Sequence, residues 1–156
     1  MKVHIVCVGK VKESYFADGI AEYAKRISRF AKIDITEVRE ENFAAEPSPS
    51  EIEKIKEREG QSILKSLKGY IVALCVEGAP CSSETLAKKM AKVRDTAGEI
   101  TFIIGGSYGL SQEVKERAAE KLSFSQMTFP HTLMRLILTE QIYRAFMIDA
   151  GSVYHK

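Results

Sequence analysis

Short apolar runs alternate along the chain with segments whose apolar residues recur every three or four positions. VHIVCV at 3–8 is rich in β-branched residues, similar runs follow at 70–76 and 99–106, and a brief one opens at 122–124. Residues 32–38 instead alternate apolar with polar positions, which suits a less buried or edge strand. Strands that are apolar on both faces are typical of parallel sheets covered by helices. The pattern therefore predicts an α/β fold.

Five segments between these runs have helical periodicity or helix-start signals. They are expected from 15 to 30, from 50 to 67, from 82 to 98, from 111 to about 121, and from 130 to about 148. Ser50 and Glu53 have the spacing of a capping box, Ser111 is a good N-cap, and Pro130 is a good first-turn residue. Helices that separate every pair of strands reinforce the expectation of a parallel sheet.

The chain of 156 residues is 45% hydrophobic, which predicts one globular domain over residues 1–156. No apolar run approaches the roughly 20 residues that span a membrane, and the start does not have the form of a signal peptide. Three cysteines at wide spacing fit neither a disulfide framework nor a CxxC metal site. These features predict a cytoplasmic protein with reduced thiols.

Charge is unevenly distributed although the net charge is only +2. Residues 1–32 hold seven Lys or Arg against three acids, whereas residues 33–59 hold nine acids against four bases. A basic N-terminal part suits an anionic partner such as RNA. Ordinary charged helix surfaces explain the same asymmetry equally well.

The glycines of GGSYG, at 105–109, follow a late strand. They either let a ligand approach bare backbone or make a tight turn that binds nothing. A Rossmann site would place its glycines after the first strand, where only Gly9 stands, and no GxxxxGK[ST] motif exists. An ordinary dinucleotide-binding fold or a P-loop therefore explains these glycines badly.

The common catalytic and metal-binding residue types give few signals. Cys7 and Cys75 lie inside apolar strands and are expected to be core residues. His4, His131 and His155 have no metal-ligand spacing, so no metal site is expected. The terminal SVYHK is either a frayed end or a segment free to fold over a site.

The last helix is mostly apolar, which packing in a core or dimer explains. Packing does not explain Arg135, Glu140 and Arg144, of which the last two form an i,i+4 pair. Such a pair is often a simple surface ion pair. Its proximity in sequence to the candidate site at 122–130 makes it a candidate for function.

Four stretches together resemble a known family: GKVKESYF, FIIGGSYGL, LSFSQMTFPHTLMRLILTEQIYRAF and the terminal YHK. Along essentially its whole length the chain resembles the bacterial ribosomal RNA large-subunit methyltransferase H family, of the SPOUT class. The resemblance implies a homodimer that transfers methyl from S-adenosylmethionine to N3 of a pseudouridine in large-subunit (23S) ribosomal RNA, without a metal. It also implies a single-domain α/β-knot fold, in which the C-terminal segment forms a trefoil knot.

The resemblance also implies a set of donor-binding positions in this sequence. They are Leu74, Gly105, Phe124, Ser125, Gln126, Met127, Thr128 and Phe129. All lie at strand ends, where ligands of parallel sheets bind. Apolar side chains suit the faces of adenine and bare backbone suits its edges. Gln126 is expected to act mainly through its backbone, and His131 is expected to cap or pack.

Three further residues are catalytic candidates. His155 is the expected proton acceptor, Tyr154 a stacking or hydrogen-bonding partner of the target base, and Arg144 a contact to phosphate or another anion. Arg135 and Glu140 are alternative candidates for holding the dimer together.

One subunit with so small a net charge has little grip on RNA, whereas a dimer doubles its basic N-terminal surface. Lys10, Lys12, Arg26 and Arg29 are therefore expected to contact phosphates. Two alternatives stay open at this point: a ribosome-associated RNA-binding protein without catalysis, and, more distantly, a small doubly wound nucleotide-binding enzyme.

Overall fold

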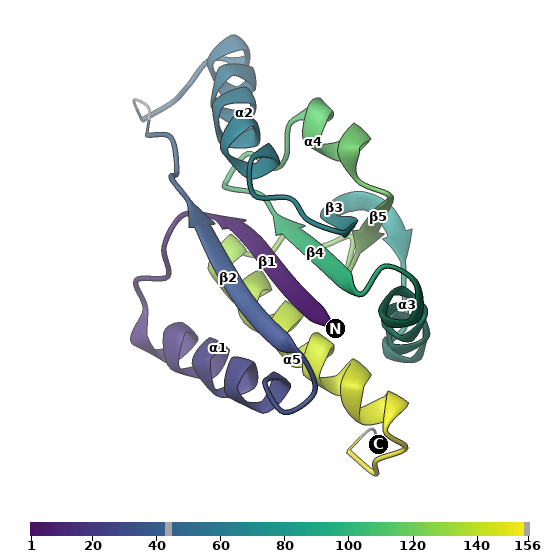
Figure 1. Ribbon diagram of the computed structural model, residues 1–156. Coiled ribbons are helices and arrows are strands. Elements are labelled where there is room, and N and C mark those ends of the chain that lie inside the picture. The colour runs from purple at the N-terminus through teal and green to yellow at the C-terminus, as the bar shows by residue number, and fades with distance from the viewer. Residues whose placement is uncertain (43–44, 155–156) are drawn as a thin grey trace.

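A five-stranded parallel sheet with strand order β2-β1-β4-β3-β5 organises the computed structural model, which describes residues 1–42 and 45–154 (Figure 1). The strands are β1 (Lys2–Val8), β2 (Lys32–Val38), β3 (Tyr70–Pro80), β4 (Glu99–Ile104) and β5 (Glu120–Ser123). The helices are α1 (Ser14–Ile27), α2 (Pro49–Leu64), α3 (Ser83–Thr96), α4 (Gln112–Arg117) and α5 (His131–Asp149). The predicted α/β class is confirmed.

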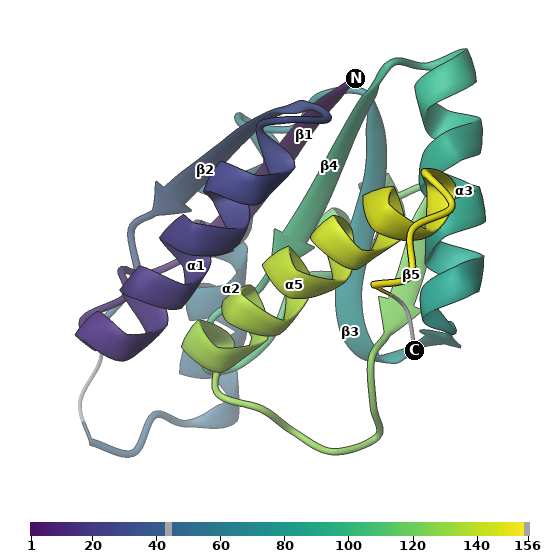
Figure 2. The ribbon, with the colours of Figure 1, turned by 90° about the horizontal axis from the view of Figure 1, so that it is seen from below.

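Helices cover both faces of the sheet and so create two apolar cores. Helices α1, α5 and α3 lie side by side on one face, as Figure 2 shows, and bury the larger core around Phe102, Leu138 and Ile142. Helices α2 and α4 cover the other face around Ile63 and Val114. The central strands β1 and β4 are buried almost throughout, as their continuous apolar runs predict.

The edge position predicted for residues 32–38 is confirmed, since β2 pairs only with β1 among the described strands. Its alternation of half-buried and exposed positions follows from having helices against one face and solvent near the other. The short strand β5 forms the opposite edge. Both edge strands, β2 and β5, are therefore less apolar than the central strands.

Several predicted helix boundaries are wrong, since α1 and α2 end three residues early, at Ile27 and Leu64, and the start of α2 and the end of α4 also differ. The capping box of α2 is formed by Ser48 and Glu51: Ser48 Oγ accepts from the Glu51 N–H at 3.3 Å, and Glu51 Oε2 accepts from the Ser48 N–H at 2.7 Å. Ser50 and Glu53 have the same spacing, but Pro49 occupies the first helical turn and sets the start one residue after Ser48. Helix α4 ends at Arg117, because the chain then joins β5.

Strand β3 contains an irregularity that the sequence does not predict. Leu74 and Ala79 both pair with Leu122, so residues 75–78 leave the regular ladder. A Cβ on Gly78 would lie 2.6 Å from the backbone carbon of Leu122, which only glycine avoids. The extra residues bulge outward at the carboxyl end of the sheet.

No helix in residues 1–42 and 45–154 is long and apolar enough to cross a membrane. The trefoil knot that the family resemblance implies stays a prediction. The carboxyl ends of β3, β4 and β5 converge near the start of α5, and this edge of the sheet contains the candidate site.

Candidate functional site

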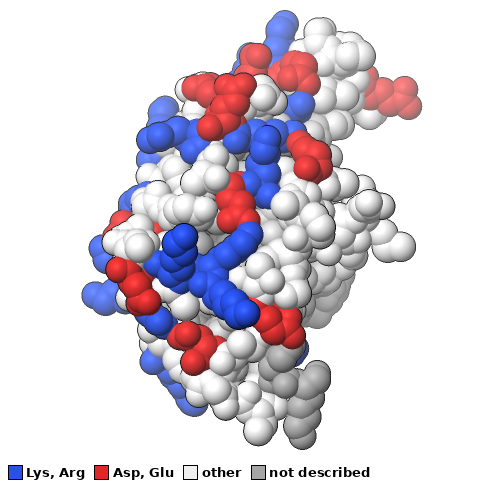
Figure 3. All heavy atoms as spheres, turned by 90° about the vertical axis from the view of Figure 1, so that its right-hand side faces the viewer, with Lys and Arg blue, Asp and Glu red and all other residues white. Residues whose placement is uncertain are grey.

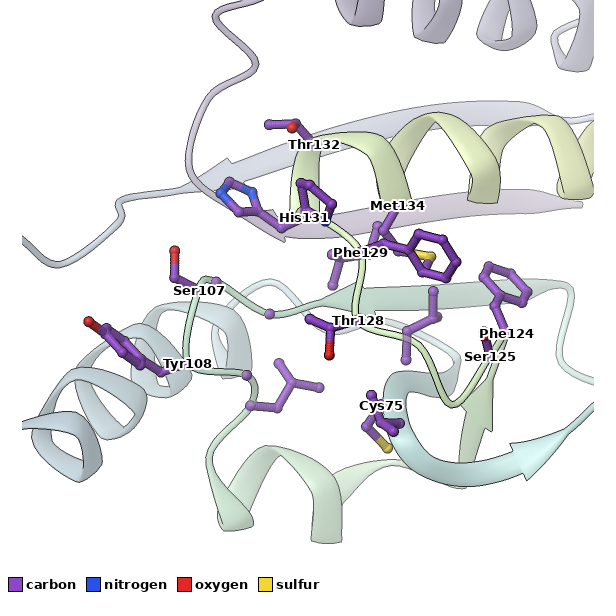
Figure 4. Close-up of a pocket in the computed structure, with 18 of the residues that line it drawn as sticks. Cys75, Ser107, Tyr108, Phe124, Ser125, Thr128, Phe129, His131, Thr132 and Met134 are labelled. Atoms are coloured by element: carbon purple, nitrogen blue, oxygen red, sulfur yellow. The ribbon is translucent and has the colours of Figure 1, made fainter. Parts of the chain in front are cut away.

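A cavity of about 890 Å³ opens at this edge of the sheet, between the strand ends and the first turn of α5 (Figure 4). Three segments form most of its wall: residues 74–77 after the regular part of β3, 104–110 after β4, and 122–130 after β5. Its size suits a drug-sized or nucleoside-sized ligand, for which pockets of about 300–1,000 Å³ are usual. Its position is the one where parallel sheets bind ligands.

The segment after β5 is held in its bend by its own serine side chains. Ser123 Oγ donates to the Ser125 carbonyl at 2.9 Å, and Ser125 Oγ accepts from the Met127 N–H at 3.0 Å. Figure 4 shows the rings of Phe124 and Phe129 on the same side of the cavity. Met127 is 73% exposed at the rim. The polar residues of this segment therefore shape the loop while its apolar residues offer a surface to a ligand.

The turn after β4 uses its glycines in two different ways. Gly109 has φ +82° and donates its N–H to the Gly106 carbonyl at 3.0 Å, which closes the turn. Gly105 and Gly106 have no positive φ. Glycine is needed at these two positions because nearby atoms leave no room for a Cβ. A Cβ on Gly105 would lie 2.8 Å from the Gly109 carbonyl carbon. The turn thus lines the cavity without projecting a side chain from Gly105, Gly106 or Gly109.

All but one of the predicted donor-binding residues lie together around this cavity. They are Leu74, Gly105, Phe124, Ser125, Met127, Thr128 and Phe129. Gln126 is exposed and does not line the cavity. Donor binding by these residues stays a prediction, but a single cavity gathers side chains that come from three separate strand ends.

Two cavity residues were expected to be structural. Cys75 lies in the bulge of β3 and lines the cavity instead of the core, and burial raises the pKa of its thiol, which keeps it protonated. His131 also lines the cavity, and its Nδ1 is buried without a hydrogen-bond partner. The sequence signal for both was their position immediately beside a strand end or a helix start.

The end of the cavity away from the two phenylalanines is polar. Lys10, Lys12 and Glu40 line it together with Ser107, whose Oγ donates to Glu40 Oε1 at 3.4 Å. A Cβ on Gly9 would lie 3.2 Å from Glu40 Oε2 and 3.3 Å from His131 Cε1, so the carboxylate and the imidazole both approach the same point of the backbone. The cavity therefore combines an apolar half with a charged half.

The predicted catalytic residues lie in a separate cluster at the other end of α5. Glu140 Oε1 accepts from Arg144 Nη2 at 2.6 Å and from the Tyr154 hydroxyl at 3.4 Å. The Arg144 guanidinium lies 5.0 Å from the centroid of the Tyr154 ring, which also meets the Tyr143 ring edge-on at 5.0 Å. Arg144 and Tyr154 thus hold each other in place.

Burial, followed by hydrogen bonding with Tyr23, raises the pKa of Tyr154 to about 12. The phenol is therefore neutral near pH 7 and acts as a hydrogen-bond donor, not as a base. The hydrogen bond to Glu140 raises the pKa of Arg144, which keeps its guanidinium charged. His155 lies outside the described residues.

One subunit does not bring this tail cluster to its own cavity. Arg144 follows Met134, which also lines the cavity, by ten helical positions, which corresponds to about 15 Å along α5. Within a single subunit Arg144 therefore lies well away from the cavity, and its catalytic role stays a prediction.

The four predicted RNA contacts also divide between two places. Lys10 and Lys12 line the cavity, whereas Arg26 lies at the far end of α1, over the rings of Tyr23 and Tyr143 at 5.6 and 5.7 Å. Arg29 is exposed just beyond that helix. On the face that carries α3, Figure 3 shows lysine and arginine mixed with carboxylates, so this face is not uniformly basic.

Arg135 has a structural role inside the subunit instead of a contact across a dimer. Its side chain is 1% exposed, donates to Glu37 Oε1 at 2.6 Å and donates to the Gly9 carbonyl at 3.0 Å. These bonds tie the first turn of α5 to the ends of β1 and β2. They also fix the start of the segment that carries Lys10 and Lys12.

Within residues 1–42 and 45–154, no group of three or more His, Cys, Asp or Glu side chains is arranged to hold a metal ion. The cavity itself presents apolar side chains, backbone groups and several charged side chains.

Comparison with known proteins identifies the family. The family profile described as "Predicted SPOUT methyltransferase" matches residues 1–155. The chain is 51% identical to "Ribosomal RNA large subunit methyltransferase H" of Lactobacillus delbrueckii subsp. bulgaricus and 48% identical to the protein of that name in Streptococcus uberis, in both cases over the full length of both chains.

Among solved structures, the SpoU methyltransferase AviRb from Streptomyces viridochromogenes, in complex with the cofactor AdoMet, aligns with 97% of this chain and 61% of its own. The TM-score is 0.47 and the identity is 12%, so the assignment rests on the full-length sequence matches. By those matches, the chain belongs to the SPOUT methyltransferase family.

Proposed function

We propose that this protein transfers a methyl group from S-adenosylmethionine to N3 of a pseudouridine in large-subunit ribosomal RNA, as a homodimer in the cytoplasm. The observation that carries the proposal is the convergence of residues 74–77, 104–110 and 122–130 on one cavity. Full-length relatives at about half identity, named as ribosomal RNA large subunit methyltransferases, support the RNA substrate.

The lining of the cavity fits the proposed donor. Phe124, Phe129 and Leu74 give the apolar surface that an adenine ring requires, and the glycines of the 105–109 turn leave backbone groups accessible to its edges. When bound, S-adenosylmethionine supplies an electrophilic methyl group on its sulfonium.

The outer face of α5 supports the homodimer. Leu133, Ile137, Glu140, Arg144 and Met147 recur at spacings of three and four, so they lie along one stripe of the helix. All five are half-buried, and the three apolar ones belong to neither core of the subunit. This stripe is apolar at both ends and carries an ion pair between them. When a two-fold axis passes through its middle, the apolar end of one copy meets the apolar end of the other, so the stripe is self-complementary.

Such a dimer brings the two separated clusters together. If two copies of α5 pack antiparallel about the middle of the stripe, the end of one helix lies beside the start of the other. The tail that carries Tyr154 and His155 then reaches the cavity of the partner subunit. We therefore propose that the catalytic residues act across the dimer.

The chemistry proposed for Tyr154 and Arg144 follows from their charge states. His155 would accept the N3–H proton of the base, and the donor, when bound, would supply the methyl group to N3. Tyr154 stays protonated and donates a hydrogen bond to the base, while Arg144 supplies a fixed positive charge for a phosphate or for the developing anion.

Lys10 and Lys12 are proposed to contact phosphates next to the target nucleotide, because they line the cavity itself. Arg26 and Arg29 would contact the RNA further away, beside the tail cluster. A ribosome-associated RNA-binding protein without catalysis is the second candidate, favoured only by these basic residues.

Two measurements separate the candidates. Calorimetric titration with S-adenosylmethionine should give micromolar binding, and labelled methyl should enter large subunits or ribosomes that lack the modification. RNA binding without donor binding would support the second candidate and exclude the methyltransferase. Methylation of a base other than pseudouridine would retain the activity and reject the proposed target.

A further inference from the structure

Glu59 is a buried carboxylate that the proposed reaction does not use. It lies on α2, is 3% exposed, and sits on the face of the sheet opposite α5. Carboxylates are rarely buried without an ion-pair partner, because burial disfavours the charged form. Its contacts explain why this position is occupied by a glutamate.

The carboxylate connects two segments that line or flank the cavity. Glu59 Oε1 accepts a hydrogen bond from the backbone N–H of Glu41 at 3.1 Å, just beyond the end of β2. A Cβ on Gly106 would lie 2.9 Å from Glu59 Oε2, so the second oxygen lies directly against the turn after β4. Glycine at 106 is what allows the carboxylate to approach this backbone.

The next residue of α2 contacts the other end of the same turn. A Cβ on Gly60 would lie 2.4 Å from Ser111 Oγ. Ser111 is the N-cap of α4 and accepts from the Val114 N–H at 3.3 Å. Two adjacent positions of α2 thus fix both the entry and the exit of the turn at 105–110.

That turn is a wall of the cavity. Gly105, Gly106 and Leu110 line it, and Ser107 is bonded to Glu40, the neighbour of Glu41. Any change in the separation between the 39–41 segment and the turn therefore changes the shape of the cavity. The carboxylate of Glu59 is the group that spans this separation.

We propose that Glu59 is a positioning residue, which clamps the 39–41 segment to the turn at 105–110 and so sets the wall against which the methyl donor binds. The inference rests on the proposed function for the identity of the donor. The clamp itself depends only on the contacts of Glu59.

The charge of the clamp changes near neutral pH. Burial raises the pKa of Glu59 to about 7; the hydrogen bond from the Glu41 N–H opposes this shift, and the charges of Glu40 and Glu41 add to it. Glu40 and Glu41 face the Glu59 carboxylate from the segment after β2. Arg58 Nη1, on α2, lies 3.6 Å from Glu41 Oε2. Val8 and Gly106 bring no charge from β1 and the turn. The clamped carboxyl therefore holds its proton more tightly than a solvated one would, so its ionisation above about pH 7 weakens the clamp.

The test compares Glu59→Gln and Glu59→Ala with Glu57→Gln, an exposed control on the same helix. Donor dissociation constants are measured by calorimetry from pH 6 to pH 8.5. The amino group of the donor titrates in this range too, so the informative quantity is the ratio of Glu59→Gln to Glu57→Gln at each pH. The ratio should be near one at pH 6 and fall several-fold below one by pH 8.5, because Gln cannot ionise, and Glu59→Ala should bind at least tenfold more weakly than Glu57→Gln at pH 6.

A ratio that does not vary with pH, or Glu59→Ala binding as tightly as the control, would overturn the proposal. Amide hydrogen exchange in the absence of donor separates this outcome from a failure of the proposed function. Glu59→Ala should speed exchange selectively at residues 40–42 and 105–110 even if no donor binds at all. Uniformly faster exchange would instead indicate general destabilisation and would also count against the clamp.

Discussion

The two ends of α5 differ in how they are built. At its start, the ends of three strands and the loops that follow them enclose a cavity with an apolar half and a charged half. At its other end, Arg144, Glu140 and Tyr154 form a compact polar cluster on one helix and the residues after it. The first end can hold a ligand, and the second offers the charge and hydrogen bonds of a catalytic site.

One subunit therefore keeps the proposed donor site and the proposed catalytic residues apart. About 15 Å of helix separates Met134, at the cavity, from Arg144, which is too far for any side chain to span. A second copy with antiparallel α5 removes that separation without changing either end. The predictions below test whether the two ends are parts of one site.

Removal of residues 154–156 should have the largest effect. Because the tail supplies the proposed proton acceptor and a hydrogen-bond donor, methyl transfer should fall by about 100-fold or more, whereas donor affinity should change less than about twofold. Single-turnover methylation and calorimetry measure the two quantities. Val153→Ala, at a position that is 79% exposed, is the matched control. Joint loss of donor binding and dimerisation would show that the tail is structural.

Gly105→Val should affect the opposite end alone. The new Cβ would lie 2.8 Å from the backbone of Gly109, so the turn must shift and donor affinity should fall by at least about tenfold. Sedimentation should still show a dimer, because the outer stripe of α5 is untouched. Gly98→Ala is the control, since nothing lies within 4 Å of its Cβ, although its φ of +69° leaves a small cost in stability. Unchanged donor affinity in Gly105→Val would place the donor elsewhere.

The residues around the cavity were easier to predict from the sequence than the proposed joining of the two ends of α5 into one site. Buried parallel strands are marked by continuous apolar runs, and ligands bind at their carboxyl ends, so the positions of Leu74, Gly105 and Phe124 at one site follow from local pattern and topology. The start of α2 was misplaced because Ser48 and Ser50 each precede a glutamate by three positions. Only the backbone preference of Pro49 separates the two alternatives.

Features that depend on long-range contacts were missed. The bulge at 75–78 arises from pairing between β3 and β5, whose register no local pattern encodes. His131 was expected to be a packing residue, but the ends of β1 and β2 approach the start of α5 and place it in the cavity. The burial of Arg135 has the same origin, because its partners Glu37 and Gly9 are about a hundred residues away in sequence or more.

Mixing the two defective proteins should restore part of the activity. Random exchange of subunits between Gly105→Val and the tail deletion gives half heterodimers, each with one cavity that is intact and faces an intact tail. Methyl transfer should therefore recover to about a quarter of the wild-type rate, from near zero for either protein alone. Recovery that fails although mass spectrometry shows heterodimers would mean that the tail acts on its own subunit's cavity.

The smallest expected effect concerns RNA, and it compares the same two ends through their basic residues. Lys10 and Lys12 line the cavity, whereas Arg26 and Arg29 lie near the tail cluster, so a dimer that joins the ends places all four along one RNA path. Replacing either pair by Gln should lower the slope of log affinity against log salt by about 1 to 2, since each phosphate contact contributes about 0.7–0.9.

Binding to ribosomal particles between 50 and 200 mM salt, about the range over which phosphate contacts are most visible, measures these slopes. Lys54→Gln, an exposed lysine on the acidic helix α2, is the control and should leave the slope unchanged. If only the Lys10 and Lys12 pair matters, the RNA meets the cavity end alone. If both pairs matter equally and the effects add, the RNA contacts both ends at once, because a single bound RNA can lose contacts at two places only when both are along its path.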